Sequence, residues 1–195
     1  APAVSAPAAS RPKPTTKFAA APPLKGSYVY QNNSYNSDVM PFSEDVVKEI
    51  NKSPTLQTQL KDLKDKGWAI QPGAAGGGSY ADTNNKLIVM DPEHMEDTAT
   101  TVQTLAHEAG HATYPVAVDS SSKESFINSQ LMDEGGATLN NIKIQREILA
   151  NGGIDIDIAG SAENLKAYNS AYDKMVSGEL SRIDAAKAIG KVYGK

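Results

Sequence analysis

Two histidines and a glutamate within one short stretch could do chemistry together. His107 and His111 lie four positions apart, so on a helix both imidazoles face the same side and can bind one metal ion. Glu108 follows the first histidine and can take a proton from a water molecule held at that ion. Zinc is the ion that two histidines at this spacing indicate. The stretch therefore predicts one Zn²⁺ ion and a general base on a single turn of helix.

The residues around this stretch predict a buried helix. They are small or apolar at helical spacing, namely Val102, Leu105, Ala106, Ala109 and Ala112. Burying two imidazoles and a carboxylate without partners would cost several kcal/mol, and a bound metal ion removes that cost. The alternative is a pair of surface histidines on a solvated helix, which needs no metal.

A catalytic zinc site has three protein ligands and one open position, so a third ligand must come from elsewhere. We assign it to Glu134, which shares a helical face with the apolar Ile127 and Leu131. An unpaired carboxylate on such a face is unfavourable. The dipeptide Gly135-Gly136 destabilises a helix by roughly 1 kcal/mol per glycine, which indicates close approach to another helix.

The histidine pattern, followed by Glu134-Gly135-x-Ala137, resembles the gluzincin metallopeptidases, whose third zinc ligand is a glutamate on a following helix. The resemblance covers roughly residues 79–140. It implies a zincin-like fold and hydrolysis of peptide bonds by metal-activated water. The two histidines and Glu134 would be the zinc ligands, and Glu108 would be the catalytic base.

Several polar residues outside the pattern have open roles. A zincin site needs a second donor for the oxyanion, and the candidates are Tyr114, Tyr168, Tyr172 and His94. A residue of each of these types is more often a packed or surface residue than a catalytic one. Asp133 can orient a ligating histidine, or it can be a solvated neighbour. Asp133 and Asp119 are also alternatives to Glu134 as the third ligand.

The elements that would position these residues indicate an α+β fold. We expect a small antiparallel sheet before the metal-binding helix and a mostly helical C-terminal half. Helices are expected after the capping residues Ser43, Ser53, Ser121 and Ser181, and over residues 163–176. Strands are expected at residues 68–70, 79–81 and 86–90, and a glycine-rich loop over residues 73–78 is expected at the rim of the cleft.

The last two expected strands would form a hairpin around Asp82-Thr83-Asn84-Asn85. Zincins hold an extended substrate against an edge strand above the metal-binding helix, and the resemblance places this hairpin there. An ordinary core hairpin fits the sequence as well.

Composition limits the classes of protein that fit. The 195 residues suit one domain, and we expect an Ala/Pro-rich linker at residues 1–24 and the metallopeptidase domain at residues 25–195. The absence of cysteine excludes thiolate ligands and disulfides. A net charge of −4 with dispersed Lys and Arg argues against a nucleic-acid partner. No stretch approaches the roughly 18 apolar residues of a membrane span.

The linker and the first residue, Ala1 in place of Met, lead us to interpret the chain as an excised C-terminal domain. This architecture is similar to the metallopeptidase toxin domains of type VI secretion spike effectors of the VgrG family. That resemblance implies an upstream delivery module, a peptide or protein substrate, a cognate immunity protein, and secretion into the periplasm of a target cell. The alternatives are a peptidoglycan stem-peptide endopeptidase or amidase, and a non-catalytic binding module with a structural zinc ion.

Overall fold

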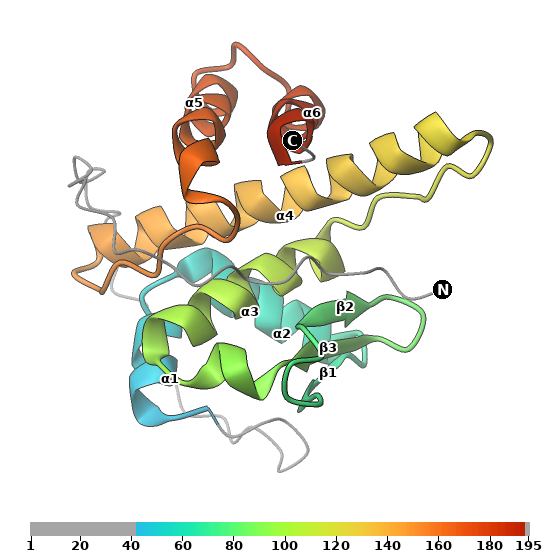
Figure 1. Cartoon of the computed structure of the whole chain (residues 1–195). Coiled ribbons are helices and arrows are strands. Elements are labelled where there is room, and N and C mark those ends of the chain that lie inside the picture. Colours follow the sequence, from blue (N-terminus) through green and yellow to red (C-terminus); the bar gives the residue numbers. More distant parts are fainter. Residues whose placement is uncertain (1–41, 194–195) are drawn as a thin grey trace.

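The computed structural model describes residues 42–193, so the predicted linker and the expected start of the domain at residue 25 lie outside the described residues. The described part mixes α and β structure and is mostly helical. Helix α4 (Lys123–Ala150) crosses the middle of the molecule, with α5 (Leu165–Val176) and α6 (Arg182–Tyr193) on one side (Figure 1). The other side holds the sheet and the helices α1 (Glu44–Ile50), α2 (Pro54–Asp65) and α3 (Thr98–Thr113).

The sheet has three short strands, β1 (Ala69–Pro72), β2 (Tyr80–Asp82) and β3 (Leu87–Met90), in the order β1-β3-β2. Strands β2 and β3 pair antiparallel, which confirms the predicted hairpin. Strands β1 and β3 pair parallel, so the prediction of an antiparallel sheet was wrong for this pair. The reason is that β3 lies between β1 and β2 in the sheet. The glycine-rich loop that joins β1 to β2 therefore crosses the position that β3 occupies.

That loop is tied down by the buried carboxylate of Asp91, which is 1% exposed. The carboxylate accepts hydrogen bonds from the N–H groups of Gly76 and Gly78 at 3.1 and 2.7 Å. It also accepts from the N–H of Glu93 at 3.0 Å and so caps the short 3₁₀ helix η1 (Pro92–Met95). Desolvation raises the pKa of Asp91, but these N–H groups outweigh it and hold the pKa below its ordinary value.

Most of the predicted helix starts are confirmed. The side chains of Ser43 and Ser53 cap α1 and α2, and Ser181 exchanges hydrogen bonds with Asp184 at the start of α6. The prediction that Ser121 caps α4 was wrong by one residue, because Ser122 is the cap. The N–H of Ser121 instead donates to the Asp119 carboxylate, so the chain is still turning at that residue.

Two apolar clusters fill the interior, and α4 contributes to both. One lies between α4, α3, the sheet and the first two helices, and it contains all five apolar residues predicted to bury α3. The other lies between α4, α5 and α6. The 28-residue helix α4 is therefore covered on opposite sides along its second half. Within residues 42–193 no helix has both the length and the apolar character needed to cross a bilayer.

Replacing Asp91 by Asn should lower the free energy of unfolding by about 1–3 kcal/mol at pH 7, because an amide group would meet buried N–H donors. The folded-state pKa of Asp91 is lowered, so its stabilising effect is present above the unfolded value of 3.8 and is lost as the pH falls through the folded value. Urea denaturation at pH 7 and below pH 3.8 should therefore show a difference between parent and variant that shrinks in acid.

The exposed Asp65 provides the control, because Asp65→Asn removes the same charge without touching the loop. It should leave the unfolding free energy nearly unchanged. A difference between parent and Asp91→Asn that is the same at both pH values would contradict the role given to the carboxylate charge.

Candidate metal centre

Helices α3 and α4 meet without a side chain between them. A Cβ atom added to Gly110 would lie 2.7 Å from the Cα of Ala137 and 3.0 Å from the Cβ of Asn140. The Asn140 amide also donates to the carbonyl of Ala106, one turn earlier on α3, at 2.8 Å. This close approach places the histidine turn of α3 directly against the turn of α4 that carries Glu134.

The three predicted ligands come together at this crossing. The Nε2 atoms of His107 and His111 are 3.2 Å apart. Oxygens of Glu134 lie 3.3 Å from Nε2 of His107 and 3.8 Å from Nε2 of His111. Ligands about 2.0–2.1 Å from a tetrahedral zinc ion are about 3.3–3.4 Å from each other. These three side chains therefore form a group that can hold a metal ion.

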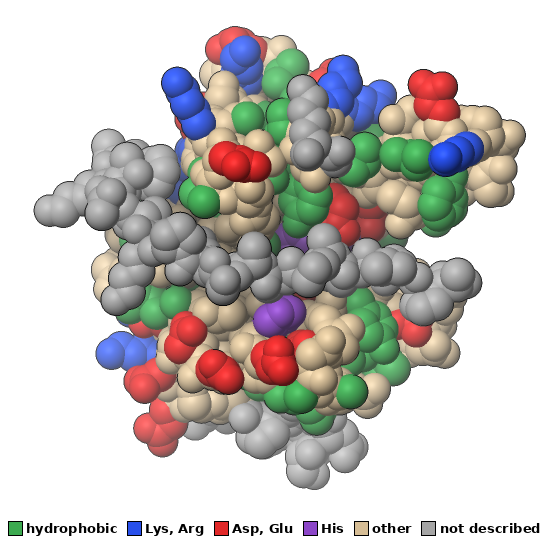
Figure 2. Space-filling view, viewed as in Figure 1, with side chains coloured by type: hydrophobic (Ala, Val, Ile, Leu, Met, Phe, Trp, Pro, Cys, Tyr) green, Lys and Arg blue, Asp and Glu red, His purple; other side chains and the backbone are tan. Residues whose placement is uncertain are grey.

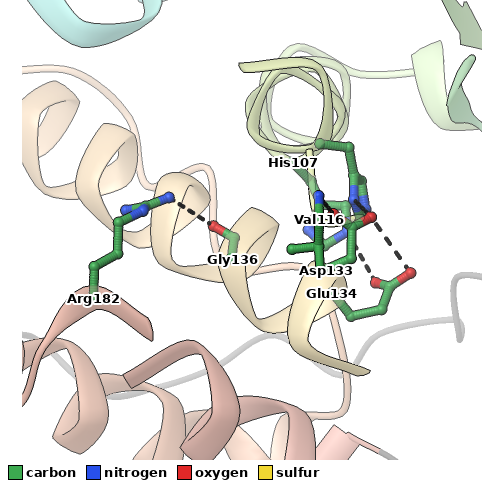
Figure 3. Close-up of polar contacts among 7 residues, drawn as sticks. His107, Val116, Asp133, Glu134, Gly136 and Arg182 are labelled. Carbon is green, nitrogen blue, oxygen red and sulfur yellow. Dashed lines mark hydrogen bonds and ion pairs between the residues drawn. The ribbon is translucent and has the colours of Figure 1, made fainter. Parts of the chain in front are cut away.

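Asp133 lies beside the group and contacts the far side of one ring (Figure 3). Its Oδ2 is 2.6 Å from Nδ1 of His111, and its Oδ1 accepts from the N–H of Val116 at 3.1 Å. In the neutral ring that binds a metal, an Nδ1–H donating to Asp133 leaves the lone pair of His111 on Nε2, which faces His107 and Glu134. In His107 the opposite nitrogen, Nδ1, is buried with no partner among the described residues, so Nε2 is its contact atom as well.

Carboxylates dominate the electrostatics of this cluster. Burial lowers the pKa of His111, but the hydrogen bond to Asp133 and the charges of Glu108 and Glu134 raise it to about 9. Burial raises the pKa of Glu108, whereas the neighbouring histidines lower it. Three carboxylates around two imidazoles leave excess negative charge in a buried place, and a divalent cation would offset it.

Two sequence features led us to assign Glu134, its apolar helical face and the glycines that follow it. The structure agrees with each of them only in part. Leu131 packs against Gly190 of α6, but Ile127 is 43% exposed, so the apolar face does not reach it. A Cβ on Gly135 would overlap the carbonyl of Ala186 in α6, which confirms the predicted close approach of a helix. Gly136 makes no such approach.

Two of the candidate tyrosines pack against arginine side chains. The Tyr114 ring, 43% exposed, is covered by the Arg182 guanidinium, whose carbon is 3.9 Å from the ring centre. Arg182 also donates to the carbonyl of Gly136 at 3.3 Å (Figure 3). Tyr172 is buried under Arg146 at 4.5 Å. These two rings are therefore engaged in packing with arginines.

The remaining candidates have other partners. Tyr168 is buried and stacks on Tyr193 with ring centres 6.0 Å apart. His94 lies on η1, which packs on α3, and its Nδ1 is 2.9 Å from Oγ of Ser79. Asp119 belongs to the turn before α4 and is not in the metal-binding group.

Sequence reasoning missed Tyr193, which stacks on Tyr168 and whose pKa is raised by burial and by the charge of Glu134. Burial raises the pKa of Glu134, but the contact with His107 and the charges of His107 and His111 outweigh it and lower the pKa overall. No spacing rule links Tyr193 to the histidine pattern. The one local signal is Gly190, one turn earlier on the same face of α6.

The space-filling view shows the surroundings of the cluster. Histidine side chains are visible between the half containing α4, α5 and α6 and the half containing the sheet (Figure 2). Asp and Glu side chains lie on both sides of them. Comparison with protein-family models, curated proteins and solved structures finds no match to this chain.

Replacing Asp133 by Asn should weaken metal binding about 10–100-fold, because His111 would lose the acceptor that fixes its ring and its tautomer. The dissociation constant for zinc can be measured by competition with a coloured chelator. Asp119→Asn is the control, since it removes a nearby exposed carboxylate that does not contact the cluster. Equal zinc affinities for parent and Asp133→Asn would show that the Asp133–His111 contact does not support the site.

Proposed function

We propose that the chain is a zinc-dependent metallopeptidase domain that hydrolyses peptide bonds. The observation that carries the proposal is the convergence of His107, His111 and Glu134 at the spacing of tetrahedral ligands, with Glu108 on the same turn. The donor set of two imidazoles and one carboxylate suits Zn²⁺.

Only three side chains form the metal-binding group among the residues that the structure describes. A structural zinc site needs four protein ligands, and His94 was the one spare histidine. Since His94 is not part of this group, the described residues favour a site with an open position over a purely structural one. An open position is what substrate or water requires.

A zinc ion held by these ligands would supply a Lewis acid that polarises the substrate carbonyl and makes water more acidic. Glu108 then accepts the proton of the attacking water and delivers it to the leaving amine. Its burial raises the pKa of its carboxyl and so favours this exchange. Asp133 holds the ring of His111 in the ligating tautomer.

Strand β2 is the natural place for an extended substrate. It lies at one edge of the sheet and packs on α3, the helix that carries the histidines. Its outer edge can therefore exchange backbone hydrogen bonds with a peptide that crosses the metal centre. The role as a delivered toxin domain, with an immunity protein as partner, is supported by the resemblance in sequence architecture to the type VI effectors.

Replacing Glu108 by Gln should leave zinc content unchanged and reduce the rate of peptide cleavage by about 10²–10⁴, because the amide cannot accept a proton. Zinc is quantified by elemental analysis, and cleavage is followed with a mixed peptide library. Glu124→Gln, an exposed change in the first turn of α4, serves as the matched control and should cleave like the parent.

Two results would contradict the proposal. Cleavage by Glu108→Gln at the parental rate would show that Glu108 is not the base. A parent protein that takes up no zinc, or whose cleavage survives removal of zinc with a chelator, would exclude the metallopeptidase mechanism.

A further inference from the structure

The N-terminal end of α4 extends beyond the helices that cover the rest of it (Figure 1). Helix α3 meets α4 at Ala137, and α6 meets it at Leu131 and Gly135. Before Leu131, α4 has about two more turns, in which Phe126 and Ile127 are 45% and 43% exposed. Hydrophobic side chains are visible over this end of the helix in Figure 2. Adjacent large apolar side chains on a surface are typical of a binding site.

The turn between α3 and α4 runs back along this end of α4 and is bonded to it at two points. The N–H of Val116 donates to Oδ1 of Asp133 at 3.1 Å, and the N–H of Asp119 donates to Oγ of Ser129 at 3.2 Å. The Ser129 hydroxyl in turn donates to the carbonyl of Phe126 at 2.8 Å. These bonds fix the exposed end of α4 relative to Asp133, which contacts a histidine of the metal centre.

Helical periodicity shows which way the exposed side chains face. Ile127 precedes Glu134 by seven residues, or about two turns, and so lies on the same face of α4. Phe126 precedes Ala137 by eleven residues, or about three turns, and so lies on the face that meets α3. Both therefore lie on the side of α4 that carries the metal-binding group. Val118, in the adjoining turn, is 57% exposed, and we call Val118, Phe126 and Ile127 the apolar arm.

The length of helix between the apolar arm and the metal centre corresponds to a short stretch of peptide. The seven residues from Ile127 to Glu134 span about 10 Å of helix. An extended peptide advances about 3.3 Å per residue. A substrate whose scissile bond lies at the metal centre would therefore bring a side chain about three residues away to the apolar arm. A large apolar side chain there would remove exposed apolar surface from water, which favours binding.

The size of the apolar arm argues against a second copy of the chain as its occupant. A stable interface between proteins buries roughly 800 Å² on each partner. Three side chains on the end of one helix and its adjoining turn offer far less than that. They are enough to contact one or two side chains of a bound peptide.

We propose that the apolar arm selects substrates by binding a large apolar side chain about three residues from the bond that is cleaved. The inference rests on the proposed metallopeptidase function. It adds a determinant of specificity outside the residues that hold the metal ion and outside the edge strand β2.

The test compares the parent with the double variant Phe126→Ser, Ile127→Ser on the mixed peptide library. The readout is the residue preference at two to four positions from the cut. One cleaved sequence is then synthesised with Leu or Ala at the preferred position. We expect the parent to cleave the Leu peptide with a kcat/KM about tenfold higher than the Ala peptide. In the double variant the ratio of the two kcat/KM values should fall to about one.

Val176→Ser is the matched control, because Val176 is an exposed apolar residue at the end of α5 and lies outside the apolar arm. It should keep the parental preference for Leu. Val118→Ser changes the turn and leaves α4 intact, so it gives an independent readout. It should lower the Leu-to-Ala ratio in the same direction as the double variant.

A parental ratio in both the double variant and Val118→Ser would overturn the inference, as would an equal loss in Val176→Ser. A parent without any apolar preference at these positions would do the same. A double variant with an unchanged ratio that sediments as a smaller species would assign the arm to a contact between copies. An unchanged ratio with a lower melting temperature would assign it to packing within the chain, and both results contradict the inference. A parent that cleaves no peptide of the library would instead contradict the proposed function.

Discussion

The backbone contact between Gly110 and Ala137 is the constraint on which the candidate site depends. Any side chain at Gly110 would push α4 away from α3, and the distance between the two histidine rings and Glu134 would grow by a similar amount. The Asn140 amide reinforces the contact by binding the Ala106 carbonyl one turn away. The small residues at this crossing thus set the distance between two segments that are remote in the sequence.

Electrostatics then explains why such a close cluster of polar groups is tolerated. Glu108 and His107 are almost fully buried, and Glu134 and Asp133 lie beside them. Buried like charges repel strongly, so the cluster as a set of ionised side chains is costly. The hydrogen bond between His111 and Asp133 relieves part of this repulsion. A divalent cation at the centre would offset the rest of the repulsion. Metal binding would therefore also stabilise the arrangement of these side chains.

The two halves of the molecule have different parts in this arrangement. The sheet, with its loop tied to Asp91, and the helix α3 provide the two histidines, Glu108 and an edge strand. Helices α5 and α6 pack on the opposite side of α4, and Ala186 of α6 contacts Gly135, the neighbour of Glu134. Because both halves pack on α4, we expect a change in the packing of α6 to shift Glu134 without altering the histidine turn of α3. The C-terminal helices are therefore a support for the site and part of its geometry.

Local patterns were sufficient for much of this. Helical periodicity places His107 and His111 on one face, and a buried apolar helix around them follows from neighbouring residues, because both depend only on nearby positions. The hairpin and most of the helix caps were also predicted from the sequence. The start of α4 was not, because the N–H of Ser121 binds the Asp119 carboxylate and the helix begins one residue later. The parallel pairing of β1, the exposure of Ile127 and the stacking of Tyr193 on Tyr168 could not be predicted. They depend on how segments far apart in the chain pack against each other, which the spacing of residues within one segment does not specify.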